Sequence, residues 1–205
     1  MLHPLPPPGS KDDGSIDFPA LARNSRDGEW EVLSFPAWAK ALQQLEIYNA
    51  GPQHLATVEE RRVRLADQWL RFSPGGKVGR FTNEAVVYLM DIFPIATDRM
   101  GALELSRLEK EGRVRDRSVE GLRGEEVFRW STLTMTIDLK TRLPPAGVEW
   151  LYTRVTNMSL RGGRADVQFV TLDQDGEVIV LSSQTMLAVD VARRFGRQQP
   201  SIEKL

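Results

Sequence analysis

Residues 83–94 read Asn-Glu-Ala-Val-Val-Tyr-Leu-Met-Asp-Ile-Phe-Pro. Asn83 is a favourable N-cap, Glu84 suits the positive end of a helix dipole, and Pro94 cannot continue a helix. We therefore expect a helix over this stretch. The residues between its ends are apolar nearly all round, which predicts a helix buried on every side rather than laid on a surface.

Asp91 is the ionisable residue inside this apolar run. A buried carboxylate is costly unless it is paired, hydrated or functional, and the C-terminal end of a helix disfavours negative charge. Both effects raise the pKa of a carboxyl group, which is the direction that a general base needs. Asp91 is thus a candidate catalytic base. The alternative is a carboxylate that only accepts local hydrogen bonds at the end of the helix.

The last third of the chain has the periodicity of strands. From Leu133 onward, apolar residues alternate with threonines, which indicates one apolar face and one hydroxyl face. We expect strands over 127–139, 148–158, 164–172 and 178–191, with a hairpin turn at the Asp-Gln-Asp-Gly of 173–176. One helix followed by four strands with short connections predicts an α+β fold, in which an antiparallel sheet covers the central buried helix.

The composition divides the chain into four parts. Residues 1–28 are rich in proline, glycine, serine and charge, which predicts a disordered tail. Residues 29–58 carry tryptophans and leucines, and they read as a strap or linker with a helix beginning near Pro36. Residues 59–192 form the compact domain, with a short surface helix expected before Gly112. Residues 193–205 form a polar tail.

The net charge, the cysteine count and the length of the apolar runs argue against several function classes. The net charge of the 205 residues is -1, so no electrostatic argument favours nucleic acid or an anionic membrane as a partner. The absence of cysteine removes disulfides and thiol nucleophiles. We find no signal peptide and no apolar run long enough to span a bilayer. These features predict a cytoplasmic protein, although the last three residues, Glu-Lys-Leu, resemble a peroxisomal signal in part.

The common catalytic signatures are also missing from the sequence. The two histidines, His3 and His54, lie in the tail and in a loop, and we find no nucleophile elbow, no nucleotide-binding glycine motif and no metal-ligand spacing. We therefore expect neither a metal nor a cofactor. Any catalysis then depends on a carboxylate with neutral partners. Gln184 and the row of Thr132, Thr134 and Thr136 are candidates, unless these side chains simply face water.

Six short pieces of sequence carry a resemblance to a known family: Leu89-Met90-Asp91, residues 132–137, Glu149-Trp150-Leu151, Gly162-Gly163-Arg164, residues 173–176 and residues 182–184. In order and spacing they resemble the hotdog-fold acyl-CoA thioesterases, in particular the C-terminal hotdog half of thioesterase II-like and fungal thioesterase-like members. The resemblance covers residues 60–192. It implies that Asp91, Thr132 and Gln184 hold and activate the attacking water, with Thr134 in place of Thr132 if the strand is shifted by one position.

The resemblance also implies a function and a partner. The expected activity is hydrolysis of acyl-CoA or another apolar acyl thioester, without a metal or a covalent intermediate. One alternative is a thioesterase-like protein of a natural-product pathway, which binds a polyketide or terpenoid and steers its cyclisation or isomerisation. Another is a non-catalytic binding module. Hotdog acyl sites lie between two halves, and only one half is visible here. We therefore expect a homodimer, unless residues 29–60 cover the sheet or the chain is a truncated gene product.

Overall fold

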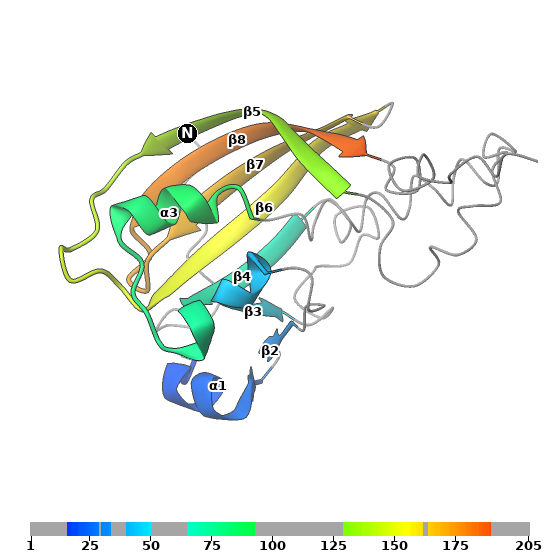
Figure 1. Ribbon diagram of the computed structural model, residues 1–205. Helices are drawn as coiled ribbons and strands as arrows, with labels where there is room; N and C mark the ends of the chain where they lie inside the picture. The colour runs from blue at the N-terminus through cyan, green and yellow to red at the C-terminus, as the bar shows by residue number, and fades with distance from the viewer. Residues whose placement is uncertain are drawn as a thin grey trace, which may run out of the picture.

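The computed structural model describes residues 16–28, 30–33, 40–50, 65–92, 129–161 and 164–189. These residues form an antiparallel sheet of eight strands with the order β1-β2-β3-β4-β6-β7-β8-β5 (Figure 1). The strands are β1 (Arg26–Asp27), β2 (Trp30–Val32), β3 (Leu45–Ala50), β4 (Leu65–Phe72), β5 (Arg129–Leu139), β6 (Trp150–Arg161), β7 (Arg164–Leu172) and β8 (Val178–Val189). The helices are α1 (Phe18–Asn24) and α3 (Asn83–Leu89), with single 3₁₀ turns at η1 (Leu42–Gln44) and η2 (Pro74–Gly76). Neither α1 nor α3 is long enough to cross a membrane.

The four C-terminal strands, β5 to β8, lie where the alternating pattern predicts them. β7 has the expected bounds, and β8 ends two residues before the expected end. The predicted hairpin turn between them is confirmed. The side chain of Asp173 accepts hydrogen bonds from the backbone N–H groups of Asp175 and Glu177, and Gly176 takes a φ of 87°, which glycine adopts without a steric cost.

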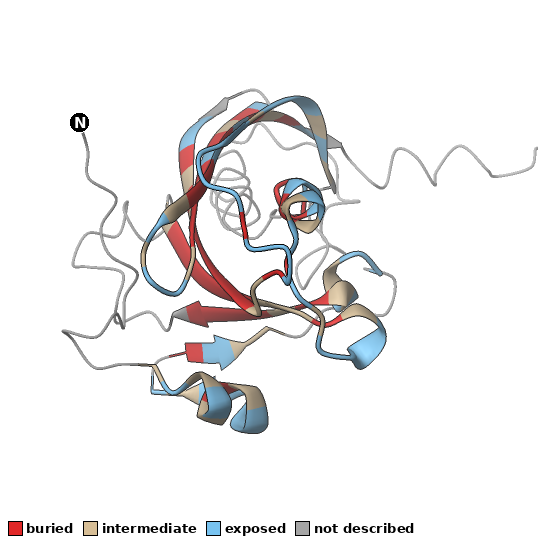
Figure 2. Ribbon diagram, turned by 90° about the vertical axis from the view of Figure 1, so that its left-hand side faces the viewer, coloured by how far each residue is buried: buried red, intermediate tan, exposed pale blue. Residues whose placement is uncertain are grey.

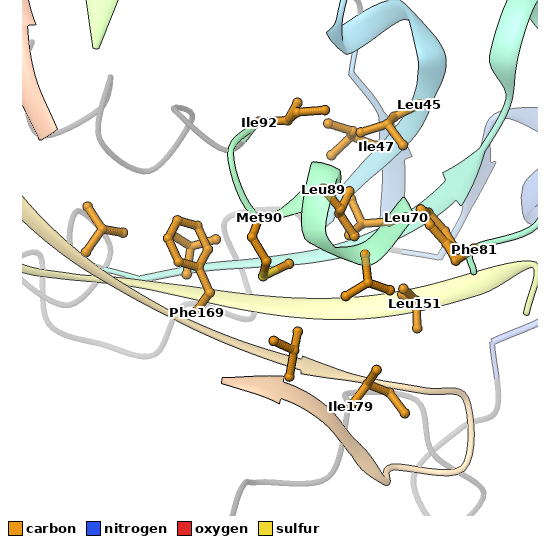
Figure 3. Packing of buried hydrophobic residues seen from close by; sticks show 14 of the residues in the cluster. Leu45, Ile47, Leu70, Phe81, Leu89, Met90, Ile92, Leu151, Phe169 and Ile179 are labelled. Atoms are coloured by element: carbon orange, nitrogen blue, oxygen red, sulfur yellow. The ribbon is translucent and has the colours of Figure 1, made fainter. Parts of the chain in front are cut away.

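The sheet curls, and α3 lies against its concave face (Figures 1 and 2). Val86 and Leu89 of α3 are fully buried and belong to one apolar cluster with residues of strands β3 to β8. Met90 follows the helix and points from its end towards the sheet (Figure 3). The apolar core therefore lies between one side of a short helix and the hollow of the sheet.

The expected burial of this helix on every side is wrong. Val87 is 40% exposed and Tyr88 is 44% exposed, so α3 is amphipathic. The helix begins after Thr82, whose hydroxyl accepts a hydrogen bond from the N–H of Ala85, and it ends at Leu89 rather than near the proline. A helix of two turns can bury only the stripe that repeats every 3.6 residues, and its other side faces away from the sheet.

The N-terminal residues differ from the predicted tail and strap. Within 1–28, residues 16–28 form α1 and β1, and the buried Leu21 anchors α1 against the sheet. Residues 30–32 and 45–50 extend the sheet as β2 and β3 instead of crossing the core, because β3 pairs with β4 and β2 pairs with β3. The helices expected near Pro36 and before Gly112, and the tail over 193–205, lie outside the described residues.

The outer face of the sheet carries a second apolar cluster, centred on Trp69 and Tyr152 and covered by α1. An ion pair lies beside it, in which the side chain of Asp67 is buried and that of Arg154 is half-buried. Arg154 donates from Nε and Nη2 to the two carboxylate oxygens of Asp67, at 2.7 and 2.9 Å, and the hydroxyl of Tyr152 donates to Asp67 at 2.6 Å. Both partners of the ion pair are thus fixed by several hydrogen bonds, which the burial of charge requires.

We expect the free energy of unfolding to fall as the pH rises above 10. Burial, followed by the charge of Asp67, raises the pKa of Tyr152 above its ordinary value of 10.0. Burial also raises the pKa of Tyr48, which donates to Glu46. A group whose pKa is raised by folding stabilises the fold fully below its unfolded pKa, and this stabilisation is lost as the pH increases. Urea unfolding at about pH 8 and about pH 11 measures the effect, and Tyr152→Phe should reduce it. An unchanged free energy of unfolding across this range would contradict the expectation.

Candidate active site

Asp91 lies in the turn that follows α3. Hydrogen bonds from the N–H of Met90 to the carbonyl of Val86, and from the N–H of Asp91 to the carbonyl of Tyr88, close this turn at 3.1 and 3.2 Å. Met90 points into the core and is fully buried, whereas the side chain of Asp91 is exposed. The expectation of a sequestered carboxylate is therefore wrong. The helix ends at Leu89, two residues before Asp91 and well before the predicted end at Pro94, so Asp91 leaves the apolar face on which burial would have desolvated it.

A β-bulge in β5 determines which threonine faces Asp91. Thr132 pairs with Met186 of β8, and Thr134 pairs with the next residue, Thr185, so Leu133 is an extra residue between them. Strict alternation would place Thr132 and Thr134 on the same face. The bulge instead turns Thr132 to the concave face with the buried Met186, while Thr134 stays on the opposite face with Thr185.

The hydroxyl of Thr132 donates a hydrogen bond to Oδ1 of Asp91 at 2.7 Å. This contact joins β5 to the turn after α3. The Asp91 side chain has no ion-pair partner within the part of the chain that the structure describes. Thr134, the alternative candidate, lines a depression of about 320 Å³ with Thr136 and Ser183, and Gln184 is also part of its lining. Of the two threonines, Thr132 is the one beside the carboxylate.

Gln184 projects from β8 to the same turn. Its side chain is only 4% exposed, and Nε2 donates to the backbone carbonyl of Met90, the residue before Asp91. The same nitrogen lies 3.0 Å from the sulfur of Met135, its cross-strand neighbour on β5. Thus Asp91, Thr132 and Gln184 come from three separate elements and converge on one turn.

Met90 and Met135 were not among the residues predicted for this site. The carbonyl of Met90 orients Gln184, and the thioether of Met135 packs against its amide. Neither role has a signal in the sequence, because the first depends on a backbone atom and the second on the register of two strands.

The arrangement is suited to holding a water molecule. A carboxylate accepts protons, the Thr132 hydroxyl orients that carboxylate through Oδ1, and the residue is exposed. Among the described residues, we find no cluster of three histidine, cysteine or acidic side chains that could hold a metal ion. The polar side chains that the structure brings to the turn of Asp91 within the described residues, Thr132 and Gln184, are both neutral.

Comparisons with known proteins agree with this architecture. A protein named thioesterase-like protein TwmA, from Talaromyces wortmannii, is 29% identical over 196 residues, which cover 90% of this chain and 54% of the relative. The chain thus spans about half the length of this curated relative. A hotdog-fold protein from Alicyclobacillus acidocaldarius aligns with a TM-score of 0.52 at 15% identity, over 80% of this chain and 52% of the other.

A second solved structure is a putative thioesterase II from Thermobifida fusca YX, with a TM-score of 0.51 at 13% identity, over 78% of this chain and 51% of the other. At these identities the likeness establishes the hotdog fold. The family described as the acyl-CoA thioesterase C-terminal domain matches residues 16–188. The chain therefore belongs to the acyl-CoA thioesterase C-terminal domain family, as its sequence resemblance predicts.

Proposed function

We propose that this protein hydrolyses acyl thioesters, with acyl-CoA as the substrate class and Asp91 as the general base. The observation that carries the proposal is the hydrogen bond of 2.7 Å from Thr132 to Asp91, beside the buried amide of Gln184. Membership of a thioesterase family supports the choice of a thioester over another ester.

In the proposed reaction, Asp91 accepts a proton from water while the water oxygen attacks the carbonyl carbon of the thioester. The carbon–sulfur bond then breaks, and the leaving thiolate takes up the proton that Asp91 had accepted, which gives the free thiol and regenerates the carboxylate. Thr132 positions the carboxylate of Asp91. Gln184 donates a hydrogen bond to the carbonyl of Met90 and so holds the turn on which Asp91 lies. No metal and no covalent acyl-enzyme take part in this sequence of steps.

The release of free thiol from a panel of acyl-CoA esters of different chain lengths tests the proposal. We expect turnover that saturates with substrate and that increases in proportion to the enzyme concentration. The absence of thiol release across the whole panel, from folded protein, would contradict the proposal.

A matched pair of threonine variants tests which face of β5 carries the activity. We expect Thr132→Val to lower kcat by about 10²-fold, because an unoriented carboxylate loses its position relative to the water. Thr134→Val should leave kcat within about twofold of wild type, because Thr134 lies on the opposite face of the sheet. Steady-state thiol release measures both variants. Equal losses in the two variants would indicate a general effect on the strand and would contradict the assignment.

We also propose that two copies of the chain pair through β5. Among the described strands β5 is an edge strand, and its exposed apolar side chains include Leu133, Met135 and Leu139. An exposed apolar edge is a ready surface for a further strand. A second chain there would also cover the open site at Asp91, which lies beside the same strand.

Light scattering after size-exclusion chromatography tests this pairing. We expect a mass of twice the 23.2 kDa of one chain. Leu139→Lys, on the edge strand, should shift the protein towards the monomer. Val78→Lys places the same charge at an exposed apolar position before α3 and should leave the mass unchanged. A monodisperse monomer of the wild type would contradict the proposed homodimer.

A second candidate function is the binding of a polyketide or terpenoid without hydrolysis. The exposed position of Asp91 favours it, because ligand binding does not require a carboxylate that is shielded from water. The relative from Talaromyces wortmannii is named only as thioesterase-like. Saturable binding of such a ligand, together with no thiol release from any ester of the panel, would favour this candidate over the hydrolase.

A further inference from the structure

A row of neutral polar side chains crosses the concave face of the sheet beside the apolar core. Asn49 of β3 pairs with Gln68 of β4, Gln68 with Thr153 of β6, and Thr153 with Thr171 of β7. This register places the four side chains next to one another on one face. Asn49 is 8% exposed and the other three are 0% exposed, so the whole row is buried. We call these four residues the polar row.

Two members of the polar row keep open hydrogen-bonding atoms. Nε2 of Gln68 donates to Oδ1 of Asn49 at 3.0 Å. Within the described part of the chain, Nδ2 of Asn49 and Oε1 of Gln68 have no hydrogen-bond partner. We call these two side chains the amide pair. A buried polar atom without a partner costs about 1–3 kcal/mol, so proteins seldom keep one without a use.

The other two members of the row satisfy each other. The hydroxyl groups of Thr153 and Thr171 lie 2.9 Å apart and share a hydrogen bond, and the Thr171 hydroxyl also contacts the sulfur of Met90 at 3.9 Å. Met90 precedes Asp91, so the row runs from the candidate active site to the amide pair. Because neighbouring strands lie about 4.8 Å apart, the amide pair is about 10–15 Å from Thr171.

We infer that the amide pair binds a hydroxyl group on the acyl chain of the substrate, which makes the substrate an oxygenated acyl thioester rather than a plain fatty-acyl one. This inference rests on the proposed function. A hydroxyl accepts from Nδ2 of Asn49 and donates to Oε1 of Gln68 at the same time. A ketone can accept a hydrogen bond from Asn49, but it has no proton to donate to Gln68. A carboxylate would be repelled by the carbonyl oxygen of Gln68.

The same kind of ligand is expected if the oxygen and nitrogen atoms of both side-chain amides are exchanged. The amide pair then presents an acceptor on Asn49 and a donor on Gln68, which again matches a group that both donates and accepts. The requirement for a hydroxyl therefore depends on the pairing of the two amides and not on the assignment of their oxygen and nitrogen atoms.

Met90 provides a route from the site to the amide pair. Its side chain is fully buried, and its sulfur contacts the hydroxyl of Thr171 at one end of the row. A methionine side chain has three rotatable bonds and repacks at a low cost. An acyl chain held with its carbonyl near Asp91 can reach the row by moving this side chain, without separating two strands.

Thioesters of N-acetylcysteamine with one chain length test the inference. The set contains the unsubstituted acyl chain and chains with a single hydroxyl group at successive carbons. We expect one hydroxylated isomer to exceed the unsubstituted chain in kcat/KM by about tenfold or more in the wild type. The double variant Asn49→Leu with Gln68→Met removes both open atoms at a similar side-chain volume, and it should abolish this preference.

A matched control changes the satisfied half of the polar row. Thr153→Val with Thr171→Val removes a hydroxyl pair at the same depth, and it should keep the preference for the hydroxylated isomer. Gln68→Met alone should also lose the preference. This single variant replaces the double variant of the amide pair in the test if the double variant does not fold. Equal kcat/KM for all isomers in the wild type would overturn the inference while leaving the hydrolase function intact.

Calorimetric binding of the matching thioethers, which cannot be hydrolysed, separates the two proposals. Suppose that no thioester is cleaved, but one hydroxylated thioether binds about tenfold more tightly than the unsubstituted one and loses this advantage in the amide-pair variants. The proposed hydrolysis then fails and the binding role of the amide pair stands. Equal affinities for all thioethers in wild type and variants would overturn the inference by an independent route.

Discussion

Replacement of Asp91 by asparagine is expected to reduce thiol release from acyl-CoA by about 10²–10⁴-fold, the usual contribution of a general base. Asparagine has nearly the same shape and can still accept the hydrogen bond from Thr132 through its carbonyl oxygen. It cannot take a proton from water at neutral pH. The loss should therefore appear in kcat, with little change in KM, and it is measured by steady-state kinetics on the best ester of the panel.

The same variant distinguishes a catalytic carboxylate from a structural one. Asp91 is exposed, so Asp91→Asn should change the midpoint of urea unfolding only slightly. A variant that stays folded and retains full activity would exclude Asp91 as the base. A variant that unfolds would show instead that the carboxylate supports the turn after α3.

Replacement of Arg154 by methionine is expected to lower the free energy of unfolding by about 3–5 kcal/mol. The carboxylate of Asp67 is only 5% exposed in its ion pair with Arg154. Removing Arg154 leaves this charge buried with the Tyr152 hydroxyl as its remaining described hydrogen-bond donor. Urea unfolding, followed by far-UV circular dichroism, measures the loss.

Two further variants show whether burial causes this effect. Arg164→Met removes the pair of Arg164 with Asp166, whose side chains are 60% and 45% exposed, and it should cost less than about 1 kcal/mol. Asp67→Asn combined with Arg154→Met removes both charges, and it should recover a large part of the loss. Similar costs for Arg154→Met and Arg164→Met would contradict the role of the buried ion pair.

The sheet could largely be predicted from the sequence because local patterns specify it. Alternation over residues 164–172 and the Asp-x-x-Gly turn that follows depend on neighbouring residues alone. The short strands β1 and β2 carry no such pattern. They exist because Trp30 and the residues around it can pair along the edge of β3, which is a contact between distant parts of the chain.

The site could be predicted only in part. The residue types at 91, 132 and 184 suggest the chemistry, and the resemblance to thioesterases selects them. The exposure of Asp91 could not be predicted, because it depends on where α3 ends, and helix ends are the least certain feature of a sequence pattern. The amide pair was also missed, since Asn49 lies in the predicted strap and its neighbour Gln68 is brought beside it only by the pairing of β3 with β4.

The extra residue at Leu133 has a consequence for how relatives of this protein should be aligned. The bulge, and not strict alternation, places Thr132 and Thr134 on opposite faces and lets the hydroxyl of Thr132 meet Asp91. In a homologue without the inserted residue, the serine or threonine that faces the carboxylate would stand one position, and not two, before the residue that corresponds to Thr134. Deleting Leu133 from this chain would therefore remove the bulge but leave Thr132 next to Thr134 and opposite Met186, so its hydroxyl would stay on the face of Asp91.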